Sequence, residues 1–192
     1  MNREQILSAI LKNQPARTEL PVELIFSSPQ RKELIEKFVE RVNFIGGKVI
    51  PIQNMLDINQ YVVDNYKSTD RVVTLIPELK DFTSFTIEED PRNFENVVLA
   101  IVKSHFGVAE NGSVWITEDQ MGHRVIPFIC QHLVMVVNSE NILANMHVAY
   151  EVIQTQDYDF GTFIAGPSKT ADIEQSLVLG AHGPRSLTIF LI

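Results

Sequence analysis

Short apolar runs alternate with helix-length segments in the first part of the chain, and this alternation limits the possible folds more than any other feature. Apolar residues recur at helical spacing from Ser28–Pro29, a pair typical of a helix N-cap and first helical position, to Gly46, which favours a helix end. The apolar runs Lys48–Ile52 and Arg71–Leu75 predict strands, and a second helix is expected between them over Asp57–Tyr66. Such alternation is typical of a parallel α/β sheet.

The remainder of the chain fits one domain preceded by a helix. Residues 3–11 have an apolar helical face, so we expect residues 1–21 to form an N-terminal helix and connection, and residues 22–192 to form a single α/β domain. A further helix is expected over Ser139–Gln154. The other expected strands are Val97–Val102, Val114–Thr117, Leu133–Val137, Thr162–Ala165 and Ser186–Ile192.

Charge and cysteine content exclude several classes of protein. The net charge of −8 disfavours nucleic acid and anionic membranes as main partners. Cys130 is the single cysteine, so one chain cannot form an internal disulfide or an iron–sulfur cluster ligated by cysteines alone. The histidines lack the spacing of metal motifs, and no metal site is predicted. Because no apolar run reaches the length of a membrane span and no signal-peptide start is present, a cytoplasmic location is expected.

Two polar loops near the C-terminus are each joined to an expected strand. Gly166–Glu174 follows Thr162–Ala165, and Gly180–Pro184 precedes Ser186–Ile192. A turn at the first loop, followed by a helix, would direct free N–H groups, hydroxyls and a lysine at a phosphate, carboxylate or pyrophosphate. A plain strand-to-helix turn explains the first loop equally well, with Ser168 or Thr170 capping the helix.

Other polar residues allow both a functional and a structural interpretation. His182, between glycines, is suited to acid/base work or to a hydrogen bond within its own turn. Glu110 could be a base or nucleophile, or merely a solvated carboxylate. Arg124 could clamp a carboxylate or form a surface ion pair. Cys130 and His132 would share one face of a strand, but no third group that would orient a catalytic pair is evident.

In combination these segments resemble the LUD (lactate utilization) domain family. Gly166–Glu174 followed by Gly180–Pro184 closely resembles the signature of that family, and the resemblance covers roughly the whole chain. Ala109-Glu110-x-Gly112-Ser113, followed by Arg124, Pro127 and His132, looks like its middle motifs in the same order. The chain departs from the family pattern at Asn111, where threonine is usual, and over residues 117–123. Its length, without a cysteine-rich ferredoxin segment, is similar to that of the stand-alone members.

The resemblance implies a Rossmann-like, mainly parallel sheet flanked by helices, related to the sugar-phosphate isomerase and CoA-transferase superfamily. It also implies a role in bacterial oxidation of L-lactate to pyruvate, as an accessory subunit beside iron–sulfur partner subunits, with a small anionic ligand at the C-terminal loops. The candidate catalytic residues are Glu110 and His182. The candidate ligand-binding residues are Gly112, Ser113, Arg124, His132, Gly166, Pro167, Ser168, Lys169, Thr170, Asp172, Glu174, Gly183 and Pro184.

Two other functions remain compatible with the same residues. One is a stand-alone, transferase-like enzyme that uses Glu110 as nucleophile or base on a CoA ester or phosphorylated small molecule, which is a hypothesis by analogy of fold. The other is a scaffolding module whose loops dock a partner.

Overall fold

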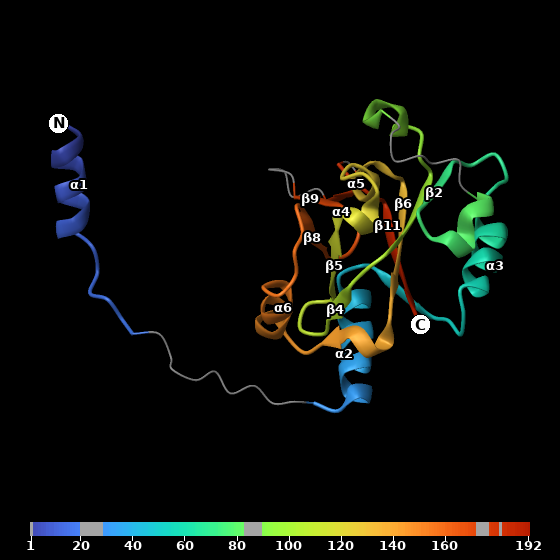
Figure 1. Ribbon diagram of the computed structural model, residues 1–192, viewed down its shortest axis with the longest axis horizontal. Helices are drawn as coiled ribbons and strands as arrows, with labels where there is room; N and C mark the ends of the chain where they lie inside the picture. Colours follow the sequence, from blue (N-terminus) through green and yellow to red (C-terminus); the bar gives the residue numbers. More distant parts are fainter. Residues whose placement is uncertain (1, 20–28, 83–89, 172–176, 181) are drawn as a thin grey trace.

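A parallel sheet lies at the centre of the protein (Figure 1). The computed structural model describes residues 2–19, 29–82, 90–171, 177–180 and 182–192. Within these residues the sheet has five strands, and their order across it is β1 (Lys48–Pro51), β11 (Ser186–Leu191), β6 (His132–Val137), β3 (Leu99–Lys103) and β2 (Val72–Thr74). The expected parallel α/β architecture is therefore confirmed.

Both faces of the sheet are covered, because successive side chains of its strands enter opposite cores. Leu133 and Met135 of β6 pack in one core with α2 (Arg31–Phe44), whereas Val134 packs in another with α3 (Leu56–Asn65). Figure 1 shows α3 on the right of the sheet, together with the 3₁₀ helix η1 (Pro77–Phe82). Another 3₁₀ helix, η2 (Pro91–Phe94), precedes β3.

A second, mostly antiparallel sheet packs on the α2 side. Its strand order is β7 (Ile142–Leu143), β4 (Phe106–Val108), β5 (Ser113–Thr117) and β8 (Gly161–Ile164). The short helices α4 (Glu118–Met121) and α5 (Ile126–Ile129) join β5 to β6, and each places an apolar residue in the same core as α2. Helix α6 (Met146–Ile153) covers the outer face of this sheet through Ala149 and Ile153.

Helix α1 (Arg3–Lys12) forms where expected and buries none of its residues. It stands apart from the sheets in Figure 1. None of the helices in the described part of the chain has the length and apolar character needed to cross a membrane.

Helix boundaries differ from expectation where a local hydrogen bond selects another start. Helix α2 begins at Arg31 after Gln30, whose N–H donates to Glu33, so the expected start at Ser28–Pro29 is wrong. Helix α6 begins seven residues later than predicted. The side chain of Asn145 accepts from Val148 N at 3.0 Å, and the residues before it form the 3₁₀ helix η3 (Ser139–Asn141) and β7.

A short hairpin replaces the helix that was expected after Gly166. Strand β9 (Lys169–Ala171) pairs antiparallel with β10 (Leu177–Leu179). The predicted anion-binding helix N-terminus is therefore wrong at these residues, because their backbone is extended and paired across the hairpin. The candidate residues Asp172 and Glu174 lie outside the described residues.

The turn between β4 and β5 depends on a glycine held against α2. Gly112 has φ +73°, and a Cβ at this position would lie 2.9 Å from Val42 N. A left-handed backbone and a close approach both exclude larger residues.

Gly112→Ala is expected to lower the free energy of unfolding by about 2–4 kcal/mol, since strain in the left-handed backbone adds to the steric clash. Asn111→Ala is the control, because it removes the side-chain bonds that Asn111 accepts from Ser113 without crowding α2, and it should cost about 1 kcal/mol. Urea unfolding measures both values, and equal losses in the two variants would contradict the steric role of Gly112.

Candidate functional site

The two C-terminal loops lie against each other. Ser168 N donates to Pro184 O at 2.8 Å, and Gly180 N donates to Ser168 O at 3.0 Å. A Cβ at Gly183 would lie 3.1 Å from the Cβ of Ser168. Motif segments separated in the sequence by the β9–β10 hairpin therefore form one local structure.

This structure borders a cavity of about 290 Å³. The residues that line it come from the end of α5, the segment before β6 and the loop before β11, and include Phe128, Ile129, Cys130, Gln131, His182, Gly183 and Arg185. We refer to it as the C-terminal cavity. Arg185 N donates to Gln131 O at 2.8 Å, which joins the loop to the start of β6.

Gly180 determines where Arg185 lies. Gly180 has φ +76°, and a Cβ there would come within 2.3 Å of Arg185 Cγ. The side chain of Arg185 therefore passes through space that only glycine leaves open. Arg185 and His182 are both exposed, so they can meet a ligand that enters from solvent.

His132 stands beside this cavity as the first residue of β6. Its Nδ1 hydrogen-bonds Ser186 Oγ at 2.7 Å, and its ring centroid is 5.8 Å from that of Tyr66. Burial and the positive charge of Arg185 lower the pKa of His132 below its usual range, partly offset by Asp70. The imidazole is therefore neutral at pH 7 and provides one donor and one acceptor.

Cys130 cannot serve as a nucleophile here. Its side chain is buried, and burial raises the pKa of the thiol to about 12. The thiolate required for nucleophilic attack is therefore scarce at neutral pH. The idea of a Cys130–His132 catalytic pair therefore loses its chemical basis.

Several residues of the first loop contact the end of α2. A Cβ at Gly166 would lie 2.7 Å from Ile45 O, and the buried Pro167 packs against Gly46. The ammonium of Lys169 donates to Ile45 O, where a cation suits the C-terminus of a helix. Thr170 lies in β9. In this arrangement the ammonium of Lys169 is bonded to the backbone at the end of α2.

The middle motifs lie elsewhere on the second sheet. Glu110 Oε2 accepts from Met146 N at 2.9 Å and so contributes to the N-terminus of α6. Ser113 is buried, and its hydroxyl donates to Asn111 Oδ1 at 2.7 Å. The role of Glu110 as nucleophile or base stays a prediction.

Arg124 forms an ion pair near the end of β5. Its Nη2 lies 2.8 Å from Glu118 Oε2, and its guanidinium carbon lies 5.0 Å from the ring centroid of Phe160. The hydrogen bond from Arg124 lowers the pKa of Glu118 below its usual range. The expected alternative of an ion pair is thus what the structure contains.

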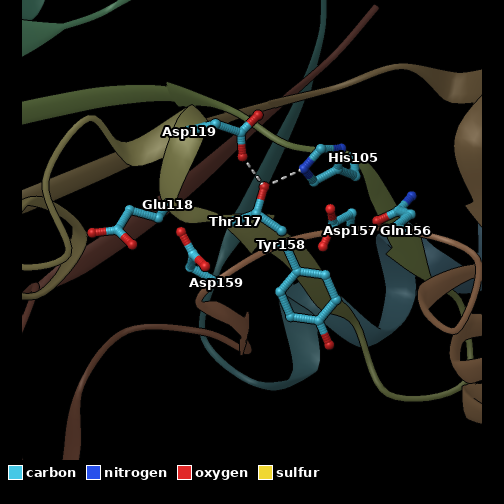
Figure 2. Close-up of a pocket in the computed structure, with 8 residues that line it drawn as sticks. All are labelled: His105, Thr117, Glu118, Asp119, Gln156, Asp157, Tyr158 and Asp159. Carbon is cyan, nitrogen blue, oxygen red and sulfur yellow. Dashed lines mark hydrogen bonds between the residues drawn. The ribbon is translucent and has the colours of Figure 1, made fainter.

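Sequence reasoning missed a larger cavity of about 610 Å³ next to this ion pair (Figure 2). Thr117 Oγ1 lies 2.5 Å from His105 Nε2 and donates to Asp119, and Figure 2 shows the hydroxyl between the two partners. Burial opposes the charge of Asp119, but the bonds from Thr117 and the nearby His105 outweigh it and lower the pKa of Asp119. An ionised Asp119 accepts a hydrogen bond from the Thr117 hydroxyl, so the hydroxyl oxygen accepts in turn from His105 Nε2–H.

The two cavities carry different charges and therefore favour different ligands. The carboxylates of Glu118, Asp119, Asp157 and Asp159 line the larger cavity and repel anions. The C-terminal cavity instead offers Arg185, His182 and Gln131 as donors. It lies at the amino ends of β6 and β11, whereas open α/β sheets usually bind ligands beyond the carboxyl ends.

Comparison with known proteins identifies the family to which the chain belongs. The model of the LUD domain family matches residues 50–192. The lactate utilization protein C of Bacillus pumilus is 29% identical over 111 residues, covering 55% of this chain and 46% of that protein. The protein of the same name from Anoxybacillus flavithermus is 31% identical over 99 residues, covering 51% of this chain and 45% of that protein.

These two matches span somewhat less than half the length of each relative. The lactate utilization protein C of Macrococcus caseolyticus aligns over all of this chain and 96% of its own length at 23% identity. The crystal structure of a DUF162 family protein from Deinococcus radiodurans shares the fold, with a TM-score of 0.61 and 14% identity over 85% of this chain and 99% of that chain. Because the family model covers well over half of the sequence, the chain belongs to the LUD domain family.

Proposed function

We propose that the protein takes part in lactate utilization and binds a small carboxylate, of the size of L-lactate or pyruvate, in the C-terminal cavity. In this proposal the protein is an accessory subunit beside iron–sulfur partner subunits, and together they oxidise L-lactate in the cytoplasm. We also propose that its domain is related to the sugar-phosphate isomerase and CoA-transferase superfamily. Membership of the LUD family and the names of its relatives support the pathway.

The observation that carries the proposed ligand is the position of Arg185. Its guanidinium can donate two parallel hydrogen bonds to one carboxylate, and Gly180 fixes the stem of the side chain. His182 and Gln131 line the same cavity and can reach the hydroxyl or carbonyl oxygen of a 2-hydroxy or 2-oxo acid. A volume of about 290 Å³ lies at the small end of ligand sites, which suits a three-carbon acid.

The chemistry of the chain supports the part of the proposal that assigns electron transfer to partner subunits. Oxidation of lactate to pyruvate releases two electrons, and the buried thiol of Cys130 stays protonated. One cysteine cannot hold a cluster ligated by cysteines alone, so clusters of that kind would belong to other subunits. In this proposal the chain holds and orients the acid, and the partner subunits take the electrons.

Arg185→Gln is expected to weaken the binding of L-lactate or pyruvate by about 10- to 100-fold, because a hydrogen bond to a charged group is worth about 1.5–3 kcal/mol. Isothermal titration calorimetry with each acid measures the dissociation constants. Arg17→Gln removes the same charge from an exposed residue remote from the cavity in sequence and should leave binding within about twofold.

Growth of cells that carry the same variants tests the ligand site and the pathway independently. A strain that lacks the gene should grow poorly on L-lactate, and a plasmid copy of wild type or Arg17→Gln should restore growth. Normal growth of the deletion strain would contradict the pathway. Full restoration by Arg185→Gln would contradict the importance of the cavity.

Acid should destabilise the protein through His132. Since folding lowers the pKa of His132, the unfolded chain binds the proton more readily. The contribution of His132 is therefore fully present above the ordinary histidine value of about 6.5 and is lost as the pH falls toward the folded value. His132→Asn, which can still hydrogen-bond Ser186, should show a flatter decline. Urea unfolding at several values from pH 8 to pH 5 measures this, and parallel curves for the two proteins would contradict the assignment.

A further inference from the structure

Phe128 is an exposed aromatic side chain on a short helix whose other residues enter the core. Its side chain is 42% exposed and lines the C-terminal cavity. In the same helix α5, Ile126 and Pro127 are buried, and Ile129 packs against the core that contains α2. Phe128 N and Ile129 N donate to Val125 O at 3.0 and 2.9 Å. The helix therefore holds Phe128 in a fixed place at the cavity.

Two chain segments enclose the C-terminal cavity and approach each other at both of its ends. One wall comes from the end of α5 and the residues that follow it, and the other comes from the loop before β11. At one end Arg185 N donates to Gln131 O at 2.8 Å. At the other end a Cβ on Gly183 would lie 3.8 Å from Phe128 O. The donors Arg185 and Gln131 thus belong to one end of the cavity, and Phe128 belongs to the other.

This difference between the ends sets the direction in which a small acid lies. The carboxylate of the acid pairs with the guanidinium of Arg185, so its carbon chain extends toward Phe128. Three residues of chain separate Phe128 from Gln131, a distance of at most about 10 Å between their Cα atoms even when extended. The ring of Phe128 offers apolar surface and no polar donor, so it suits a methyl group and not a second carboxylate.

We infer that Phe128 determines the specificity of this site. It limits the length of the carbon chain and excludes dicarboxylic acids, which leaves short monocarboxylic 2-hydroxy and 2-oxo acids as the class that fits. The inference rests on the proposed carboxylate site and adds to it the residue that selects among acids.

Both walls at the Phe128 end are backed by other parts of the protein. Ile126 and Pro127 anchor α5 in the core, and a Cβ on Gly183 would lie 3.1 Å from the Cβ of Ser168. Because the walls cannot separate freely, an acid with a longer chain meets the ring of Phe128. One methylene too many in an apolar pocket typically weakens binding by about 10- to 200-fold.

The experiment titrates the full-length protein with L-lactate, L-2-hydroxyhexanoate and L-malate by calorimetry. Wild type should bind lactate at least about tenfold more tightly than either of the other acids. Phe128→Ala removes the ring, and the variant is expected to fold because the residue is exposed. It should improve the affinity for 2-hydroxyhexanoate relative to lactate at least about tenfold. Lactate itself should weaken by no more than about fourfold, the value of one buried methylene.

Phe44→Ala is the matched control, because Phe44 is 79% exposed near the end of α2 and lies outside the cavity lining. It should leave the affinity ratios of the three acids unchanged within about twofold. Phe128→Arg places a guanidinium where the carbon chain ends, and it should improve the affinity for malate relative to lactate at least about tenfold.

The outcomes separate this inference from the proposed function. If wild type binds none of the acids at 5 mM, the carboxylate site is wrong and the inference falls with it. If lactate binds but its ratio to 2-hydroxyhexanoate is the same in wild type and Phe128→Ala, the role of Phe128 is overturned and the carboxylate site stands. Equal changes of this ratio in Phe128→Ala and Phe44→Ala would also overturn the role of Phe128.

Discussion

Burial of both faces of β6 is the constraint on which the rest of the structure depends. From Leu133 to Val137 every side chain is apolar and buried, with alternate residues in opposite cores. Such a strand is stable only when both faces are covered, here by α3 on one side and by α2 with the second sheet on the other. Polar groups are thereby confined to the ends of the strand, which is where His132 and Ser186 meet.

The cavities at the edges of the fold differ in the charge of the residues that line them. The cavity around Thr117 is the largest of those described above, yet its carboxylates make it a poor receptor for an acid. The smaller C-terminal cavity offers Arg185 and His182 beside a neutral His132. For an anionic metabolite, the sign of the charge at the cavity matters more than its volume.

The sequence predicted the elements whose signal is local. Continuous apolar runs marked β6 and β11, and helical spacing marked α2 and α3. It failed at Lys169–Ala171, where a glycine–proline–serine turn also suits a helix start and pairing with Leu177–Leu179 decides the outcome. It also failed at His105 and Thr117, which only the fold brings together. Their one local signal was a polar Thr-Glu-Asp run directly after an expected strand.

The motif residues have different roles in the structure. Gly112 and Gly166 allow the turns to approach the backbone of α2, and Lys169 closes the end of that helix. Gly166 and Lys169 thereby hold the first loop, which in turn contacts the second loop through Ser168. Arg185 and Gln131, which contribute donors to the cavity, lie just outside the motifs, and Gly180 leaves open the space that the Arg185 side chain occupies. Apart from His182, the motif residues therefore support the cavity, and Arg185 and Gln131 beside them provide further groups that can contact a ligand.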